Sequence, residues 1–142
     1  MDYTYLEESL FALVLWREAQ NQSEQTMTAV AWSIRNRVMT KNWFGVGYVG
    51  VITHPWQYSS FNANDPNSRK YPTAGDVSFK KCMRVATAVY QNEQPDGPVD
   101  PTQGAVSYYD KSLDSNPPKW ALDTVQMKHT VDVGDFHFYK LV

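Results

Sequence analysis

Glu18 is the residue whose type and spacing most clearly suggest chemistry. On a helix it would lie four residues after Val14 and eight after Leu10, so it extends an apolar stripe. A carboxyl on an apolar face is desolvated, which raises its pKa and can keep it protonated near neutral pH. Such a group can donate a proton to a glycosidic oxygen as the bond breaks. The alternative is a structural role, in which Glu18 pairs with a cation such as Arg37 from the next helix.

A second catalytic carboxylate cannot be identified from spacing. Four aspartates in predicted loops or turns are the candidates: Asp65, Asp100, Asp110 and Asp135. Most glycosidases use two carboxylates, so an enzyme that relies on Glu18 alone must find its nucleophile elsewhere.

The three histidines, His54, His129 and His137, have no HExxH or comparable spacing. We interpret His129 and His137 as hydrogen-bonded structural residues rather than ligands, and we predict no metal and no cofactor. Cys82 is the single cysteine, so no intrachain disulfide can form. It falls on the apolar face of a predicted helix, which indicates a core position and not a catalytic thiol.

The chain has 142 residues, 42% of them hydrophobic, which predicts a single folded domain over residues 1–142. Its net charge is −2 and no basic run exceeds two residues, so nucleic acid and anionic membranes are not expected partners. No apolar run is long enough to span a membrane, and the Met-Asp-Tyr-Thr start lacks the basic region of a secretory signal. We therefore expect a monomer that is made in the cytoplasm and has no stable membrane association.

Aromatic residues make up 14% of the chain, including five Trp and nine Tyr. A core of this size cannot hide all of them, so some must lie at the surface. Exposed rings suit a ligand such as a sugar, whose C–H face packs on an aromatic ring, although any single ring is more simply explained as core.

Three helices are predicted in the first two thirds of the chain. Thr4-Tyr5-Leu6-Glu7 resembles a capping box that opens a helix to about Ala19, with Leu6, Leu10, Leu13 and Val14 on one face. Ser23 would cap a second helix, which pairs with the first as a hairpin through Met27, Val30, Ala31, Ile34 and Val38. Asp76 would cap a third helix to about Asn92, ended by Gln94–Pro98. Its inward residues would be Phe79, Cys82, Met83, Ala86, Val89 and Tyr90.

Residues 41–75 lack periodicity and are rich in turn-forming residues, which predicts a long functional loop. The last third predicts strands at Ala105–Tyr109, within Thr124–Val133 and at Phe136–Tyr139. Helices first and a small β region in the C-terminal third indicate an α+β fold.

The chain carries an ordered series of short motifs: Glu18-Ala19, Ala29-Val30, Asn36-Arg37-Val38, Val51-Ile52, Gln57-Tyr58-Ser59, Asp100-Pro101-Thr102, Gly104-Ala105, Tyr108-Tyr109, Trp120, Gly134 and His137-Phe138-Tyr139. This series resembles the cell-wall hydrolase family of spore-cortex-lytic enzymes (the SleB and CwlJ type), whose relatives include phage endolysins. Each motif is short, but their common order over residues 18–139 is specific.

The resemblance implies a mainly helical, two-lobed domain similar to goose-type lysozyme and the lytic transglycosylases. It implies that Glu18 is the general acid/base of a glycosidase that cuts peptidoglycan between N-acetylmuramic acid and N-acetylglucosamine. The sugar's own 6-hydroxyl can then attack, as in a lytic transglycosylase, which would explain why no second carboxylate stands out. Attack by water, as in a muramidase, stays open.

The resemblance also suggests residues that hold the glycan strand: Gln57, Ser59, Asn36, Tyr109, Trp120 and His137. Gln57 and Ser59 lie in the long loop, where they could bind N-acetyl and sugar oxygens or brace the loop itself. Asn36 could face the cleft or brace its helix against a loop.

Tyr109 would place its hydroxyl near the bond that is cut, and Tyr108 would point away because neighbouring strand residues alternate. Trp120 could stack on a sugar or belong to the core. Two departures from the family pattern stand out. Glu18-Ala19 is followed by Gln20-Asn21-Gln22 instead of Arg-Gly-Glu, and Asp110 stands where Asn is usual.

Two other functions remain open beside the glycosidase. A zinc-dependent peptidoglycan amidase or peptidase would also cut the wall, and a carbohydrate-binding module would keep the cleft without the chemistry. A catalytic domain without a wall-binding domain looks more like a phage endolysin, so we expect it to act on the cell wall of a host.

Overall fold

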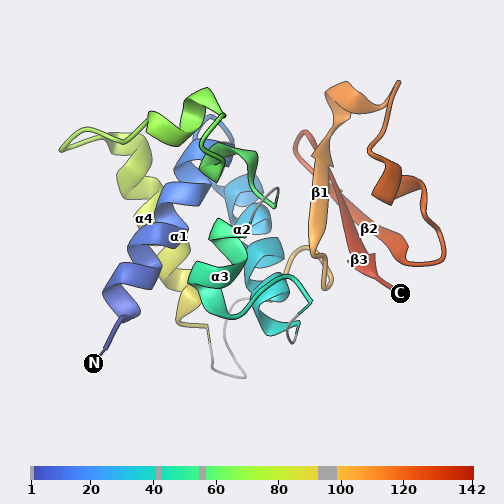
Figure 1. Cartoon of the computed structure of the whole chain (residues 1–142), viewed down its shortest axis with the longest axis horizontal. Coiled ribbons are helices and arrows are strands. Elements are labelled where there is room, and N and C mark those ends of the chain that lie inside the picture. Colours follow the sequence, from blue (N-terminus) through green and yellow to red (C-terminus); the bar gives the residue numbers. More distant parts are fainter. Residues whose placement is uncertain (1, 41–42, 55–56, 93–98) are drawn as a thin grey trace.

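The computed structural model describes residues 2–40, 43–54, 57–92 and 99–142. Its main elements there are α1 (Thr4–Ala19), α2 (Glu24–Met39), α3 (Gly47–Thr53), α4 (Val77–Tyr90), β1 (Ser107–Asp110), β2 (Met127–Val133) and β3 (Phe136–Leu141). The helices form one lobe and the sheet lies beside it, with α2 and α3 on the side toward the sheet (Figure 1). The predicted α+β, two-lobed architecture is confirmed. Within the described ranges, no helix is both long and apolar enough to cross a membrane.

Helix α1 has the predicted bounds, but the predicted capping box is wrong. Tyr3 is the N-cap residue and makes no side-chain cap. The Asp2 carboxylate instead accepts hydrogen bonds from the backbone N–H of Thr4 (2.9 Å) and from its hydroxyl (2.6 Å). Leu6, predicted to face inward, is exposed. The buried face is broader than the predicted stripe, because α2, α3 and α4 all contact α1. Its buried residues are Glu8, Phe11, Ala12, Val14, Leu15, Trp16 and Ala19.

Helices α2 and α4 confirm the predicted caps. The Ser23 hydroxyl accepts a hydrogen bond from the backbone N–H of Thr26 (3.2 Å), and the Asp76 carboxylate accepts one from Phe79 (2.9 Å). These contacts satisfy donors that a helix start leaves free. The apolar stripe of α2 is buried, apart from the half-buried Val38. Helix α4 packs against both α1 and α2, so the predicted hairpin is one part of a larger helical layer. The predicted stop at Gln94–Pro98 lies outside the described residues.

The segment predicted as a structureless loop contains α3 and two short 3-10 turns, η1 (Ser59–Phe61) and η2 (Pro66–Arg69). The α3 sequence GYVGVIT holds two glycines, which disfavour a helix in isolation. Contacts with α1 and α2 stabilise it nonetheless, since Tyr48, Val51 and Ile52 are buried. Tertiary packing therefore overrides local propensity here.

The sheet has the order β1-β3-β2, with both pairings antiparallel. Its inner face, toward the helices, carries Tyr108, Phe136 and Phe138, whose rings contact one another. Its outer face carries Tyr109, His137 and Tyr139. The predicted strands are confirmed, although β1 begins at Ser107.

Gly134 holds the β2–β3 turn against the start of α2. Its φ of +55° lies in the left-handed region, which favours glycine. A Cβ at this position would lie 2.4 Å from the hydroxyl oxygen of Thr26, closer than such atoms can approach. The sheet and the helical lobe are therefore in direct contact at this turn.

We expect Gly134→Ala to be more destabilising than Gly75→Ala. Both positions have positive φ, but nothing lies within 4 Å of a Cβ built on Gly75. The backbone cost is common to both variants, so the difference between their unfolding free energies measures the clash with Thr26, about 1–3 kcal/mol. Chemical denaturation of the two variants tests this. Equal losses would mean that the turn can move away from α2.

Candidate active site

Glu18 lies in the last turn of α1 and is partly buried. Its pKa is raised to about 7, first by burial and second by the negative charge of Asp65, while the positive charge of Arg37 lowers it. Among the described residues, no hydrogen bond or ion pair engages the Glu18 carboxylate. The alternative of a direct Glu18–Arg37 ion pair is therefore not what the structure contains.

The Arg37 guanidinium forms hydrogen bonds with both lobes instead of pairing with Glu18. From α2 it donates hydrogen bonds to the Val106 carbonyl, to the side-chain oxygen of Gln57 and to the Ser107 hydroxyl. Its Cζ atom also lies over the ring of Tyr58, 5.2 Å from the ring centroid. One side chain thus connects α2, the loop after α3 and the start of β1.

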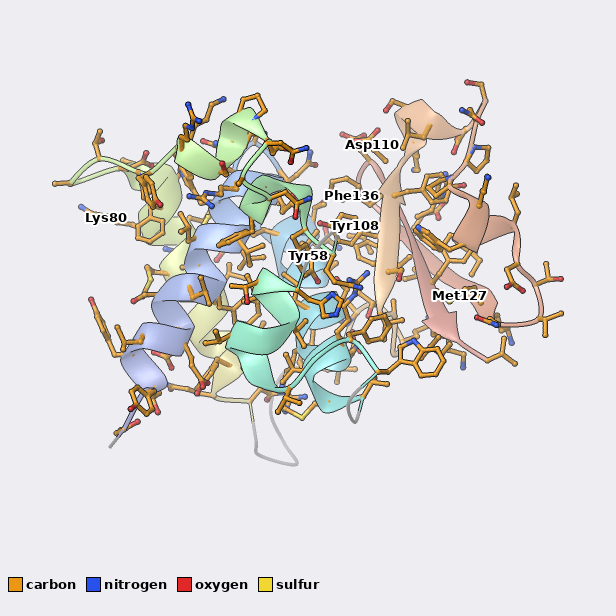
Figure 2. The ribbon with its side chains drawn as sticks, in the orientation of Figure 1. Tyr58, Lys80, Tyr108, Asp110, Met127 and Phe136 are labelled. Carbon is orange, nitrogen blue, oxygen red and sulfur yellow. The ribbon has the colours of Figure 1, made fainter. Side chains whose placement is uncertain are left out.

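Two tyrosines face Glu18 and Arg37. Burial raises the pKa of Tyr58 to about 12, and it raises the pKa of Tyr108 well above its ordinary value. Glu18 and Arg37 both act electrostatically on each of these phenols. Figure 2 shows Tyr58 and Tyr108 between the helices and β1. We call Glu18, Arg37, Tyr58 and Tyr108 the Glu18 cluster.

Asp65 is the second carboxylate with an influence on Glu18. Its side chain caps η2 by accepting a hydrogen bond from the backbone N–H of Asn67 (2.8 Å). It acts on Glu18 as a like charge, which makes loss of the Glu18 proton harder. The sequence could not separate Asp65 from the other loop aspartates, because its proximity to Glu18 depends on how the loop folds back.

A pocket of about 310 Å³ lies next to the cluster, between the helical lobe and the sheet. Arg37, Gln57 and Ser107 line it together with the rings of Trp43, Phe44 and Trp120. Glu18 is not one of its lining residues, and Arg37 is the side chain that the pocket and the Glu18 cluster share. Two of the predicted glycan-binding residues, Gln57 and Trp120, therefore meet here.

Tyr109 and His137 lie elsewhere, on the outer face of the sheet. Their rings contact each other, with centroids 4.9 Å apart, and Tyr109 also contacts Trp120. The two tyrosines point to opposite faces of the sheet as predicted, but the prediction had assigned the faces the other way round. Tyr108 faces Glu18, and Tyr109 faces away from it.

The remaining predicted residues have structural contacts or lie outside the described atoms. Asn36 donates hydrogen bonds from its side-chain nitrogen to Asp100 (2.8 Å) and to the Ala105 carbonyl (2.9 Å), which is the bracing alternative. Asp110 caps a short turn by accepting from the Ser112 N–H (2.8 Å). Ser59 begins η1, and its side chain lies outside the described part of the chain.

A helical lobe, a small antiparallel sheet and a carboxyl of raised pKa near their junction define an α+β domain with a candidate acid between its lobes. The chain belongs to the Cell Wall Hydrolase family, whose profile matches residues 21–139. The predicted family is confirmed, although the match begins three residues after Glu18.

Two solved structures have the same fold. The catalytic domain of Bacillus cereus SleB is similar with a TM-score of 0.72 and 21% sequence identity, over 98% of this chain and 93% of that one. The catalytic domain of the germination-specific lytic transglycosylase SleB from Bacillus anthracis gives a TM-score of 0.70 and 20% identity, over 94% and 93%. None of the curated proteins matches this chain in sequence.

We expect Asp65→Asn and Arg37→Met to shift the pKa of Glu18 in opposite directions. Removal of the like charge should lower this pKa below about 7, and removal of the cation should raise it above about 7. Titration of the Glu18 carboxyl carbon by NMR measures both shifts. Arg37→Lys is the matched control, since it keeps the positive charge while losing the forked contacts. A rise in the Asp65→Asn variant would contradict this account of the site.

Proposed function

We propose that this protein degrades peptidoglycan by cutting the glycan strand between N-acetylmuramic acid and N-acetylglucosamine, with Glu18 as the general acid/base. The observation that carries the proposal is the pKa of Glu18, raised to about 7 at the junction of the lobes. An ordinary glutamate is almost fully ionised at neutral pH and cannot donate a proton, whereas Glu18 keeps a large protonated fraction there. Membership of the Cell Wall Hydrolase family supports the substrate class.

Glu18 would take part in two proton transfers, which involve two different protons. Protonated Glu18 donates to the glycosidic oxygen as the C–O bond breaks, and the leaving sugar departs as an alcohol. The resulting carboxylate then removes a proton from the attacking hydroxyl, which regenerates the acid. In a lytic transglycosylase this hydroxyl is the 6-hydroxyl of the same muramic acid, so the product is a 1,6-anhydro sugar and no water is consumed. The name of the Bacillus anthracis relative, a lytic transglycosylase, favours this outcome over hydrolysis.

Tyr58 and Tyr108 would act as neutral hydrogen-bonding groups and not as bases. Their pKa values are raised above the ordinary value of 10, so both phenols keep their protons at neutral pH. The Tyr58 hydroxyl is buried and has no hydrogen-bond partner among the described residues. Arg37 limits how far the pKa of Glu18 rises, so that the conjugate base remains accessible.

The pocket between the lobes would hold saccharide units on one side of the bond that is cut. Trp43 and Trp120 offer ring faces, and Gln57 and Ser107 offer polar atoms beside them. This combination suits a sugar, which has apolar C–H faces and a polar edge. Of the residues expected to bind the strand, Gln57 and Trp120 remain in the proposal. The enzyme would act on the wall as a monomer.

A zinc-dependent amidase or peptidase has one observation in its favour. His129, Asp132 and His137 form a group that could hold a metal ion. The group lies on the outer face of the sheet, and none of its three residues lines the pocket or belongs to the Glu18 cluster, so it does not assist the acid chemistry proposed here.

We expect Glu18→Gln to abolish cleavage while leaving wall binding intact. The amide is close in shape to the acid but cannot donate and recover the proton, so turnover should fall at least a hundredfold, on the order expected for loss of a general acid. Mass spectrometry of digested peptidoglycan should show anhydro ends with the wild type and none with the variant. Glu24→Gln, which changes an exposed glutamate at the start of α2, is the matched control. Free stem peptides would overturn the glycosidase assignment.

The activity should fall as the pH rises through about 7. The protonated form of Glu18 is the active one, and it predominates below its pKa of about 7. Above that value the rate should drop about tenfold for each pH unit, until another process takes over. Initial rates of wall lysis between about pH 5 and pH 9 measure the profile. In Asp65→Asn the descending limb should move to lower pH, and an unmoved limb would assign it to another group.

Glu18→Gln should also stabilise the fold, but only above the ordinary pKa of glutamate. The folded-state pKa of about 7 exceeds the unfolded value near 4.5, so ionisation of Glu18 favours unfolding as the pH rises between them. The variant lacks this penalty and should gain about 1–3 kcal/mol over the wild type above pH 7, allowing for partial exposure. At about pH 4 the two should be equally stable. Denaturant titrations at both pH values test the growth of the gap.

A further inference from the structure

The outer face of the sheet carries a second cluster of polar side chains, which could bind a metal ion. His129 and Asp132 come from β2, and His137 comes from β3 directly opposite Asp132. Residues three apart on a regular strand point to opposite faces. The register shift between His129 and Val131 adds one residue to β2, and this bulge returns His129 and Asp132 to the same face. An irregularity of the strand therefore gathers the three side chains.

Their polar atoms converge on one carboxylate oxygen. Oδ1 of Asp132 lies 2.7 Å from Nε2 of His129 and 2.7 Å from Nδ1 of His137. One ligand-type atom from each of the three residues lies within 4.8 Å of the other two. The side chains of His129 and Asp132 are 46% and 41% exposed, so an ion can reach the group from solvent.

Asp114, in the loop after η3 (Lys111–Leu113), fixes the orientation of the His137 ring. Its Oδ1 lies 2.8 Å from Nε2 of His137, on the far side of the ring from Asp132. Nδ1, on the other side of the ring, lies beside Oδ1 of Asp132, and together with Nε2 of His129 it is the nitrogen placed to bind an ion there.

We propose that His129 Nε2, His137 Nδ1 and Asp132 Oδ1 bind one zinc-class divalent ion, with Asp114 as the hydrogen-bond partner that orients His137. Two imidazoles with one carboxylate suit zinc and its first-row neighbours, whereas magnesium and calcium prefer oxygen ligands alone. A carboxylate that receives the second N–H of a ligating histidine is the usual companion of such sites. Ligands about 2.0–2.1 Å from one ion lie roughly 3.4 Å apart, so the two short contacts would open by roughly 0.7 Å. Exposed side chains at the edge of a bulge permit that movement.

The ion would tie three pieces of the β lobe together: β2, β3 and the loop that carries Asp114. It would take a water molecule as its fourth ligand, because three protein ligands leave one tetrahedral position open. The site lies across the sheet from Tyr108, so the ion stabilises the lobe without entering the reaction at Glu18. This proposal does not depend on the proposed glycosidase activity. A measurement of metal binding tests it directly.

Calorimetric titration of zinc chloride into the untagged protein, first stripped with a chelator, tests the proposal. The wild type should bind one zinc ion per chain, and its thermal midpoint should rise with zinc but not with magnesium. His129→Ala and Asp132→Asn each remove a ligand and should weaken zinc binding more than tenfold, while Asp114→Asn should weaken it about tenfold. His54→Ala, which removes a histidine outside the group, is the matched control and should bind zinc as the wild type does. Circular dichroism of each variant establishes that it is folded.

Three results would overturn the site. The first is the lack of saturable zinc binding to the wild type, which would assign the position between His137 and Asp132 to a proton. The second is unchanged affinity in both His129→Ala and Asp132→Asn. The third is a loss in His54→Ala as large as that in His129→Ala, which would mean that zinc binds histidines on the surface without selection.

Discussion

The Arg37 guanidinium is the interaction on which the arrangement of the candidate site depends. It satisfies the Val106 carbonyl and the Ser107 hydroxyl at the start of β1, and it also binds Gln57 from the loop after α3. Arginine suits this task because its fork of donors is planar and remains charged when partly buried. The same charge lowers the pKa of Glu18 against the effect of burial. One side chain therefore connects the two lobes and also lowers the pKa of the proposed catalytic group.

The acidity of Glu18 is a balance of three effects with different structural origins. Burial comes from the packing of α1 against its neighbours, the like charge comes from Asp65 in a loop, and the opposite charge comes from α2. Desolvation is the largest of them. Glu18 lies at the end of α1, near the junction of the two lobes, where all three effects act on it. The side chain there is removed from bulk water and yet remains near a pocket that can admit a ligand.

Strand alternation divides the β lobe into two chemically different faces. The inner face presents Tyr108 to the Glu18 cluster, while the outer face carries a polar aromatic group that includes Tyr109 and His137. A short sheet that packs on one side has this property in general, because successive side chains point in opposite directions. The bulge in β2 changes the alternation locally and gathers the histidines with Asp132 on the outer face. The fold thus puts the proposed acid and the proposed metal site on opposite faces of the sheet.

The sequence by itself determined the extent of α1, the caps of α2 and α4 and the late strands, because caps and periodicity are local signals. It also singled out Glu18 as the candidate acid, a role that stays a prediction. It missed α3, whose glycines disfavour a helix that packing nonetheless stabilises. It also could not decide which tyrosine of the Tyr108-Tyr109 pair faces the acid, since alternation fixes that they differ but not which one is inward. Asp65 and Asp114 gained their neighbours only through folding. Contacts between distant segments were decided by the tertiary structure. Charges and lone pairs interact through space, so residues that meet in this way show no periodic pattern in the sequence.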